Sequence, residues 1–255
     1  MIKGFDGKII EIEKKGLFYP VNMELCEEEG RNFLHIGVKS YFACAFEENQ
    51  VSIEQWRECI LEGFREWAGE YTVFGGQQLT VTVKTEEAAS PSVDTVPILC
   101  LSETKAKEFI GQYVEQNQQS SIEQALLQQR SFSTTMIEGV VSWNSILPRY
   151  IVLMPSAFTD TYTLKRTAKH EFGHILGLGD SYKDESLGYQ GVGMYHDILP
   201  YYSEKKGFDM VMDNCGPVRN NDIEMVILAF FTNRFQNYQS VQNANAISFA
   251  LGRGN

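Results

Sequence analysis

Cationic side chains and long apolar runs are both scarce in this 255-residue sequence. Lys and Arg together number 22 against 33 Asp and Glu, which gives a formal net charge of −11. A surface that binds nucleic acid or an anionic membrane needs clustered cations, so we expect neither as a partner. The longest apolar run, residues 225–231, is much shorter than the roughly 20 residues that cross a bilayer. The sequence therefore predicts no membrane span.

Cysteines and secretory features are also few. The five cysteines are odd in number and scattered, with no Cys-x-x-Cys pair, which is typical of free thiols rather than of a disulfide framework. The first residues lack the apolar core of a secretory signal peptide. Three localisations stay open: the cytoplasm, secretion followed by trimming, and export by another route.

Hydrophobic residues make up 43% of the chain, enough to fill the core of one large domain. We expect a lead-in strand or hairpin over residues 1–30, a single domain over 31–240 and a polar tail over 241–255. Within the domain, glutamines crowd the stretch at about 102–133, which predicts a solvated helical insertion.

Alternating apolar and polar residues predict several short strands, and the one at 33–42 is expected to be the first strand of the main sheet. Further strands are expected at 78–84, 97–101, 139–144 and 150–154. A capping box at Ser52–Gln55 opens an amphipathic helix over about 52–69, and a final apolar helix is expected from about 221 to 236. This mixture indicates an α+β domain.

Two of only four histidines fall in one predicted helix at about residues 162–177. His170 and His174 are four residues apart, so both imidazoles can lie on one face of the helix. Glu171 follows the first histidine, and Gly177 can take backbone angles that turn the chain back toward that face. Asp180 can then join the two histidines. This spacing predicts a metal site with a base beside it.

Zinc suits this set of donors. A catalytic zinc takes three protein ligands, imidazole nitrogens and carboxylate oxygens among them, and keeps water in the fourth position. His170, His174 and Asp180 are the three candidate ligands for one catalytic Zn²⁺. Water bound there has a pKa of about 7, so Glu171 can act as the general base that removes its proton.

The pattern His-Glu-x-x-His-x-x-Gly-x-x-Asp over residues 170–180, followed by Met212 in an apolar turn, resembles the metzincin zinc metalloproteases. The resemblance covers about residues 33–84 and 139–236. It implies a mixed, mostly parallel twisted sheet, a long backing helix, a zinc-site helix, a methionine turn under the metal and a C-terminal helix. It also implies that the domain divides near residue 180 into an N-terminal subdomain, to about 179, and a C-terminal subdomain.

The chain departs from the family pattern in three respects, one of which is the glutamine-rich stretch at about 102–133, which has no named counterpart in the family. Most metzincins have histidine where this chain has Asp180, a variant best known from snapalysin-like members, so His196 is the alternative third ligand. Met210 is a less favoured candidate than Met212 for the methionine of the turn. Asn214 stands where some families place a tyrosine that donates a hydrogen bond in the transition state.

The same resemblance implies where a substrate would bind. The strand at 139–144, which carries Val141 and Trp143, is expected to pair with an extended peptide. The stretch before Met212, which includes Tyr201, is expected to form one wall of a specificity pocket.

The function that the resemblance predicts is a zinc-dependent endopeptidase acting on a protein or peptide. Two alternatives stay open: a proteolytic effector or toxin domain aimed at one protein, and a non-catalytic metal-binding module on the same fold. An inhibitor or immunity protein is a further candidate partner.

Two more residues with metal-binding chemistry lie upstream. Cys26 precedes three glutamates and is interpreted as a packed thiol rather than as a cysteine that caps the metal. His35, in the strand at 33–42, is interpreted as a hydrogen-bonded strand residue rather than as a ligand.

Overall fold

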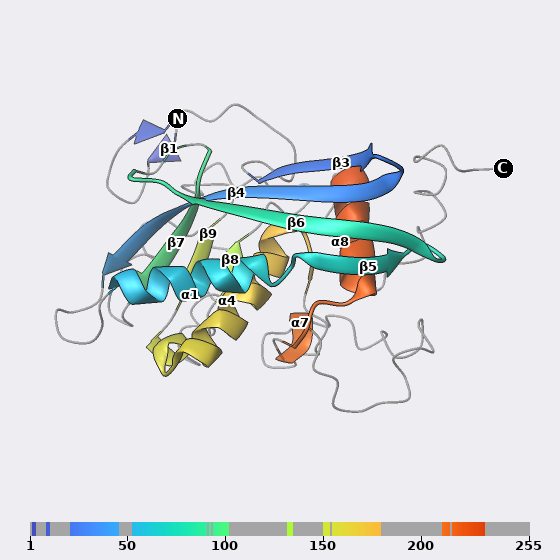
Figure 1. Ribbon diagram of the computed structural model, residues 1–255. Helices are drawn as coiled ribbons and strands as arrows, with labels where there is room; N and C mark the ends of the chain where they lie inside the picture. The colour runs from blue at the N-terminus through green and yellow to red at the C-terminus, as the bar shows by residue number, and fades with distance from the viewer. Residues whose placement is uncertain are drawn as a thin grey trace.

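One large seven-stranded sheet forms the centre of the described fold (Figure 1). The computed structural model describes residues 2–3, 9–10, 21–45, 53–90, 92, 94–101, 132–134, 150–153, 155–179, 211–214 and 216–232. Among them, no helix is both long and apolar enough to cross a membrane.

The sheet has seven strands, with the order β5-β6-β4-β7-β9-β8 and with β3 paired to β4 off this path. Its central strands β6, β4, β7 and β9 run parallel to one another, whereas β3, β5 and β8 pair with their neighbours in antiparallel fashion. The described part of the chain is therefore an α+β fold with a mixed sheet. The strands are β3 (Asn22–Glu28), β4 (Arg31–Ala45), β5 (Gly69–Val73), β6 (Gln77–Glu87), β7 (Val96–Leu101), β8 (Phe132–Thr134) and β9 (Tyr150–Leu153).

The prediction that the strand at 33–42 is the first of the main sheet is wrong, because β3 comes before it in the chain. β3 precedes it and pairs with β4 through a two-residue turn at Glu29 and Gly30, whose φ angles are 52° and 78°. Positive φ at both central residues marks a type I′ turn, whose twist matches that of the flanking strands. β3 was missed because glutamates, which are depleted in strands, occupy several of its positions.

Helices α1 (Ile53–Arg65) and α4 (Thr161–Ile175) lie side by side along the sheet (Figure 1). The rings of Phe64 and Phe172 stack between them, with centroids 4.3 Å apart. Gly63 permits the close approach of the backbones, because a Cβ at this position would lie 2.5 Å from the Lys165 carbonyl oxygen. α1 ends earlier than the predicted residue 69, since β5 already begins at Gly69.

Helix α8 (Asn220–Thr232) is attached to the β5 edge of the sheet. The Phe74 amide donates a hydrogen bond to Glu224 Oε1 over 2.6 Å, and the Thr72 amide donates to Asn220 Oδ1 over 3.2 Å. The predicted apolar face is buried along most of the helix, at Ile223, Met225, Val226, Ile227, Leu228 and Ala229. Phe231, which was also expected to be buried, is 40% exposed near the end of the helix.

The fold also contains four short elements among the described residues. β1 (Ile2–Lys3) and β2 (Ile9–Ile10) form a separate antiparallel pair, η1 (Pro155–Phe158) is a 3₁₀ turn, and α7 (Val211–Asn214) is a single helical turn. β8 occupies residues where the end of a helical insertion was predicted. Residues 102–131, the rest of that insertion, lie outside the described chain, as does the strand predicted at 139–144.

Candidate metal centre

The histidine-bearing helix α4 begins at a carboxylate cap. The side chain of Asp160 accepts hydrogen bonds from the Thr163 amide (2.7 Å) and the Thr163 hydroxyl (2.8 Å). These bonds, the backbone one first, hold the pKa of Asp160 below its usual value. Asp160 is therefore the N-cap of the helix. A fixed start sets the rotation of every later residue around the helix axis.

The same helix ends immediately after its second histidine in a Schellman motif. The Leu178 amide donates to the Gly173 carbonyl over 3.0 Å, and the Gly177 amide donates to the His174 carbonyl over 2.9 Å. Gly177 has a φ of 88°, a left-handed conformation that suits glycine. The chain therefore turns back at Gly177, as the sequence predicted, and brings Leu178 next to His174.

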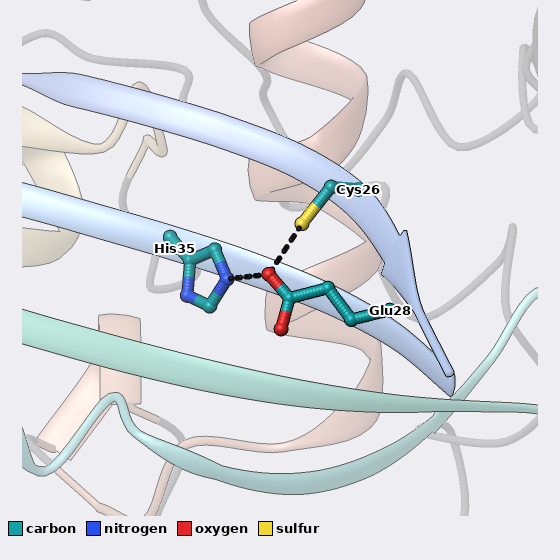
Figure 2. Close-up of side chains that lie close together, drawn as sticks. All are labelled: Cys26, Glu28 and His35. Carbon is teal, nitrogen blue, oxygen red and sulfur yellow. Dashed lines mark hydrogen bonds and ion pairs between the residues drawn. The ribbon is translucent and has the colours of Figure 1, made fainter. Parts of the chain in front are cut away.

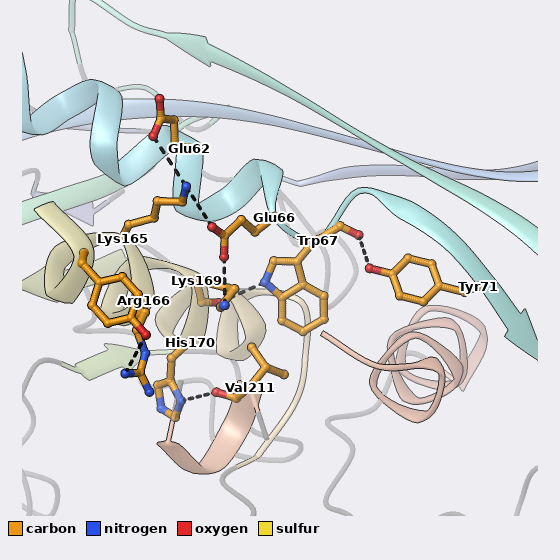
Figure 3. Close-up of polar contacts among 10 residues, drawn as sticks. Glu62, Glu66, Trp67, Tyr71, Lys165, Arg166, Lys169, His170 and Val211 are labelled. Carbon is orange, nitrogen blue, oxygen red and sulfur yellow. Dashed lines mark hydrogen bonds and ion pairs between the residues drawn. The ribbon is translucent and has the colours of Figure 1, made fainter. Parts of the chain in front are cut away.

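Both histidines are held by backbone carbonyls. His170 Nδ1 lies 2.8 Å from the carbonyl oxygen of Val211 in α7 (Figure 3), and His174 Nδ1 lies 2.8 Å from the carbonyl oxygen of Leu178. A carbonyl can only accept, so Nδ1 of each ring carries the proton. In the neutral imidazoles the lone pair is then on Nε2, and the two rings are 4.9 Å apart between centroids. Second-shell bonds of this kind orient histidines that ligate metals.

Glu171 occupies the position after His170 and is almost fully buried, with 3% of its surface exposed. His170 is 7% exposed, and its neighbour Lys169 is 6% exposed. Burial of a carboxylate beside an imidazole is costly unless both have a polar environment or a cation nearby. The buried part of this helix therefore contains ionisable side chains as well as apolar ones.

Met212 lies directly against the histidine helix. It is fully buried in α7, and a Cβ at Gly173 would overlap its sulfur and lie 2.9 Å from Trp67 Cζ2. The Trp67 indole donates to the Lys169 carbonyl over 3.0 Å (Figure 3). Met212 and Trp67 therefore pack against α4 in the turn that separates the two histidines.

An ion-pair cluster ties α4 to Glu66, the residue directly after α1 (Figure 3). Glu66 accepts from Lys169 Nζ over 2.8 Å and from Lys165 Nζ over 2.9 Å. Burial works against ionisation of Glu66, but the hydrogen bonds and charges of the two lysines together hold its pKa below the usual value. These pairs keep Glu66 ionised and fix the orientation of α4.

The described residues thus bring together four of the predicted site residues: His170, Glu171, His174 and Met212. The other candidates all lie outside the described residues: Asp180, His196, Met210, Val141, Trp143 and Tyr201. Sequence reasoning missed Val211 and Leu178, because backbone carbonyls carry no residue-type signal.

A second group of metal-binding side chains lies on the β3–β4 hairpin (Figure 2). One ligand atom from each of Cys26, Glu28 and His35 lies within 4.8 Å of the other two, so the group could hold a metal ion. Burial, a hydrogen bond to Glu28 and the charges of Glu28 and Glu24 raise the pKa of the Cys26 thiol. Cys26 and His35 were weighed separately in the sequence, and the hairpin register that joins them to Glu28 was missed.

Comparison with known proteins gives no relative for this chain: no family model, no curated protein and no solved structure matches it significantly.

Proposed function

We propose that this chain is a zinc-dependent endopeptidase whose centre is built on α4. The observation that carries the proposal is the pair of hydrogen bonds from His170 Nδ1 and His174 Nδ1 to backbone carbonyls, each 2.8 Å long. Two imidazoles one helical turn apart, both with the lone pair on Nε2, are suited to ligating one metal ion. The His-Glu-x-x-His pattern and the buried Met212 beside Gly173 support the same assignment.

The donor set fits zinc. His170 and His174 would supply two nitrogens, and Asp180 is the proposed third ligand, with His196 as the alternative. Bound zinc would lower the pKa of a water ligand and polarise a peptide carbonyl. Hard cations such as Mg²⁺ and Ca²⁺ prefer sites made of oxygen, so two imidazoles argue against them.

The protein groups then have separate tasks. Glu171 is proposed to remove a proton from the attacking water and to deliver it to the leaving amine nitrogen. The carbonyls of Val211 and Leu178 keep each Nδ1 protonated, which holds both rings in one tautomer throughout. Met212 and Trp67 pack against Gly173, between the two histidines, and keep the helix from rotating.

Substrate recognition is proposed for residues on either side of the helix in sequence. An extended protein or peptide would pair with the segment at 139–144 that is predicted to be a strand, near Val141 and Trp143, and Tyr201 would line a specificity pocket. Exchanging Trp143 or Tyr201 for alanine should change the cleavage preference. An unchanged preference in both variants would remove these two residues from the proposal.

Glu171→Gln tests the proposed reaction. Glutamine matches glutamate in shape but cannot take a proton, so hydrolysis of a peptide library should fall by about 10²-fold or more. Zinc content, measured by mass spectrometry, should be unchanged. Glu62→Gln on α1 is the matched control, because Glu62 is exposed and its carboxylate is paired with Lys165, at 3.7 Å, on the side of α4 that faces α1. Equal hydrolysis by wild type and Glu171→Gln would refute the proposal.

Wild-type chain that holds zinc but cleaves no peptide in the library would favour the non-catalytic metal-binding module instead. Cleavage of one protein but of no library peptide would favour the effector alternative. The same digest therefore separates all three functions.

A further inference from the structure

We infer that Cys26, Glu28 and His35 form a second zinc site, which clips strand β3 to strand β4. The inference is independent of the proposed peptidase centre, because its ligands come from the hairpin and not from α4. Three different donor types converge on one point of the sheet surface: a thiol, a carboxylate and an imidazole (Figure 2). Zinc accepts all three as ligands.

The strand register explains why these side chains meet. Cys26 and Glu28 are two residues apart on β3, so they share one face of the sheet. In the antiparallel register Cys26 lies opposite Phe33, and His35 is two residues further along β4 on the same face. The opposite face of β4 carries the buried Leu34 and Ile36, which leaves the three ligands on the side away from the core.

The distances already match zinc coordination on two of three edges. Cys26 Sγ is 3.6 Å and His35 Nε2 is 3.4 Å from the same oxygen, Glu28 Oε1. Zinc–sulfur bonds of about 2.3 Å and zinc–nitrogen or zinc–oxygen bonds of about 2.0–2.1 Å give tetrahedral edges of about 3.6 Å and about 3.3–3.4 Å. The third edge, from sulfur to nitrogen, is within 4.8 Å, so a rotamer adjustment of at most about 1 Å closes it.

His35 is already oriented by groups that do not ligate. Its Nδ1 lies 2.7 Å from Thr82 Oγ1 on the neighbouring strand β6, and its ring stacks on Phe33 with centroids 5.5 Å apart. A hydroxyl can donate or accept, so this bond survives when Nε2 gives up a proton and takes the metal. Outer partners of this kind orient the ring of metal-ligating histidines.

The local charge favours a divalent cation. A thiolate and the Glu28 carboxylate would together neutralise Zn²⁺, and Glu24 lies directly opposite His35 in the register. The side chains of His35 and Glu28 are 36% and 58% exposed, so an ion can enter from solvent and water can fill the fourth position. The packed-thiol interpretation of Cys26 does not account for its place beside two other ligand groups.

Cobalt binding to the full chain tests the site, because a cobalt–thiolate bond adds a charge-transfer band in the near ultraviolet. The His170, His174 and Asp180 set contains no thiolate, so the band reports the hairpin site alone. Wild type should develop the band as cobalt fills the hairpin site, and excess Zn²⁺ should remove it. Cys26→Ser should abolish it, whereas Cys59→Ser, which removes another partly buried free cysteine, should retain it.

Thr82→Val provides a variant with every ligand intact. Loss of the bond to His35 Nδ1 should weaken cobalt affinity by about 10-fold or more. Thr80→Val is its matched control, because the Thr80 hydroxyl bonds Glu70 instead. Zn²⁺ should also raise the thermal midpoint of wild type more than that of Cys26→Ser. A wild type without the band, or a band of equal strength in Cys26→Ser, would overturn the inference.

Discussion

Gly173 and Met212 touch so closely that a single methyl group on Gly173 would overlap the Met212 sulfur. Gly173 lies between the two histidines of α4, and Met212 is fully buried in the helical turn that also offers the Val211 carbonyl to His170. One small contact therefore sets the distance between the histidine helix and the group that orients its first ring.

Gly173→Ala should destabilise the fold. On an unhindered helix alanine is favoured over glycine by up to about 1 kcal/mol. Here the added methyl meets Met212 and Trp67, so overpacking should lower the free energy of unfolding by about 1–3 kcal/mol. Urea denaturation measures the difference. Gly37→Ala is the control, because its Cβ would make ordinary contact with Asn22 Cβ at 3.6 Å. A Gly173→Ala variant as stable as wild type would mean that this contact is not tight.

Asp160 should make the stability of α4 depend on pH at the acid end. Its pKa is lowered in the folded state, so the stabilisation is complete above the unfolded pKa of about 3.9 and is lost as the pH falls through the folded pKa. Asp160→Asn keeps an oxygen for the cap but cannot titrate. We expect its thermal midpoint to match that of wild type at pH 7 and to fall less below pH 4, whereas Asp160→Ala should be lower throughout. Parallel acid profiles for wild type and Asp160→Asn would contradict this.

Lys169→Met should cost about 1–2 kcal/mol of unfolding free energy. The change removes a buried cation from Glu66, whose side chain is 35% exposed and keeps Lys165 as a partner. The loss should therefore be smaller than the 3–5 kcal/mol typical of breaking a fully buried pair. Lys84→Met, which breaks the exposed pair with Glu86, should have no measurable effect in the same urea titration. Equal losses of unfolding free energy at the two positions would contradict the claim that the buried pair contributes more than the exposed one.

Glu224 should have the opposite pH dependence to Asp160. Burial raises its pKa against the effect of the hydrogen bond from the Phe74 amide, so the folded state holds its proton more tightly than the unfolded state does. Its contribution is then favourable at low pH and is lost as the pH rises from the unfolded pKa of about 4.3 through the folded value. Relative to wild type, Glu224→Gln should gain thermal stability between pH 4 and pH 7. A relative loss over this interval would reverse the sign of the argument.

Elements with strong local patterns were predictable from sequence, and those defined by distant contacts were not. The helix at 161–175 and strand β4 each have a clear hydrophobic period, and Gly177 indicates the turn after His174. β5 was missed because its five residues follow α1 without a turn signal, and it is defined by pairing with β6.

The residues of the candidate metal centre also fall into two groups, those predictable from local spacing and those defined by distant contacts. His170, Glu171 and His174 were identified because their spacing along one helix is a local property. Val211 is 41 residues from His170 in the sequence, and Thr82 is 47 residues from His35, so no local pattern predicts either contact. Glu28 was overlooked because only the hairpin register brings it to His35.

The most direct test of the central claim is peptide hydrolysis by the Cys26→Ser chain before and after removal of zinc. This background leaves the α4 centre as the site that takes up metal. Treatment with a chelator should reduce hydrolysis by about 10²-fold or more, and one equivalent of Zn²⁺ should restore it. Hydrolysis that persists at the same rate in the zinc-free chain would contradict the account.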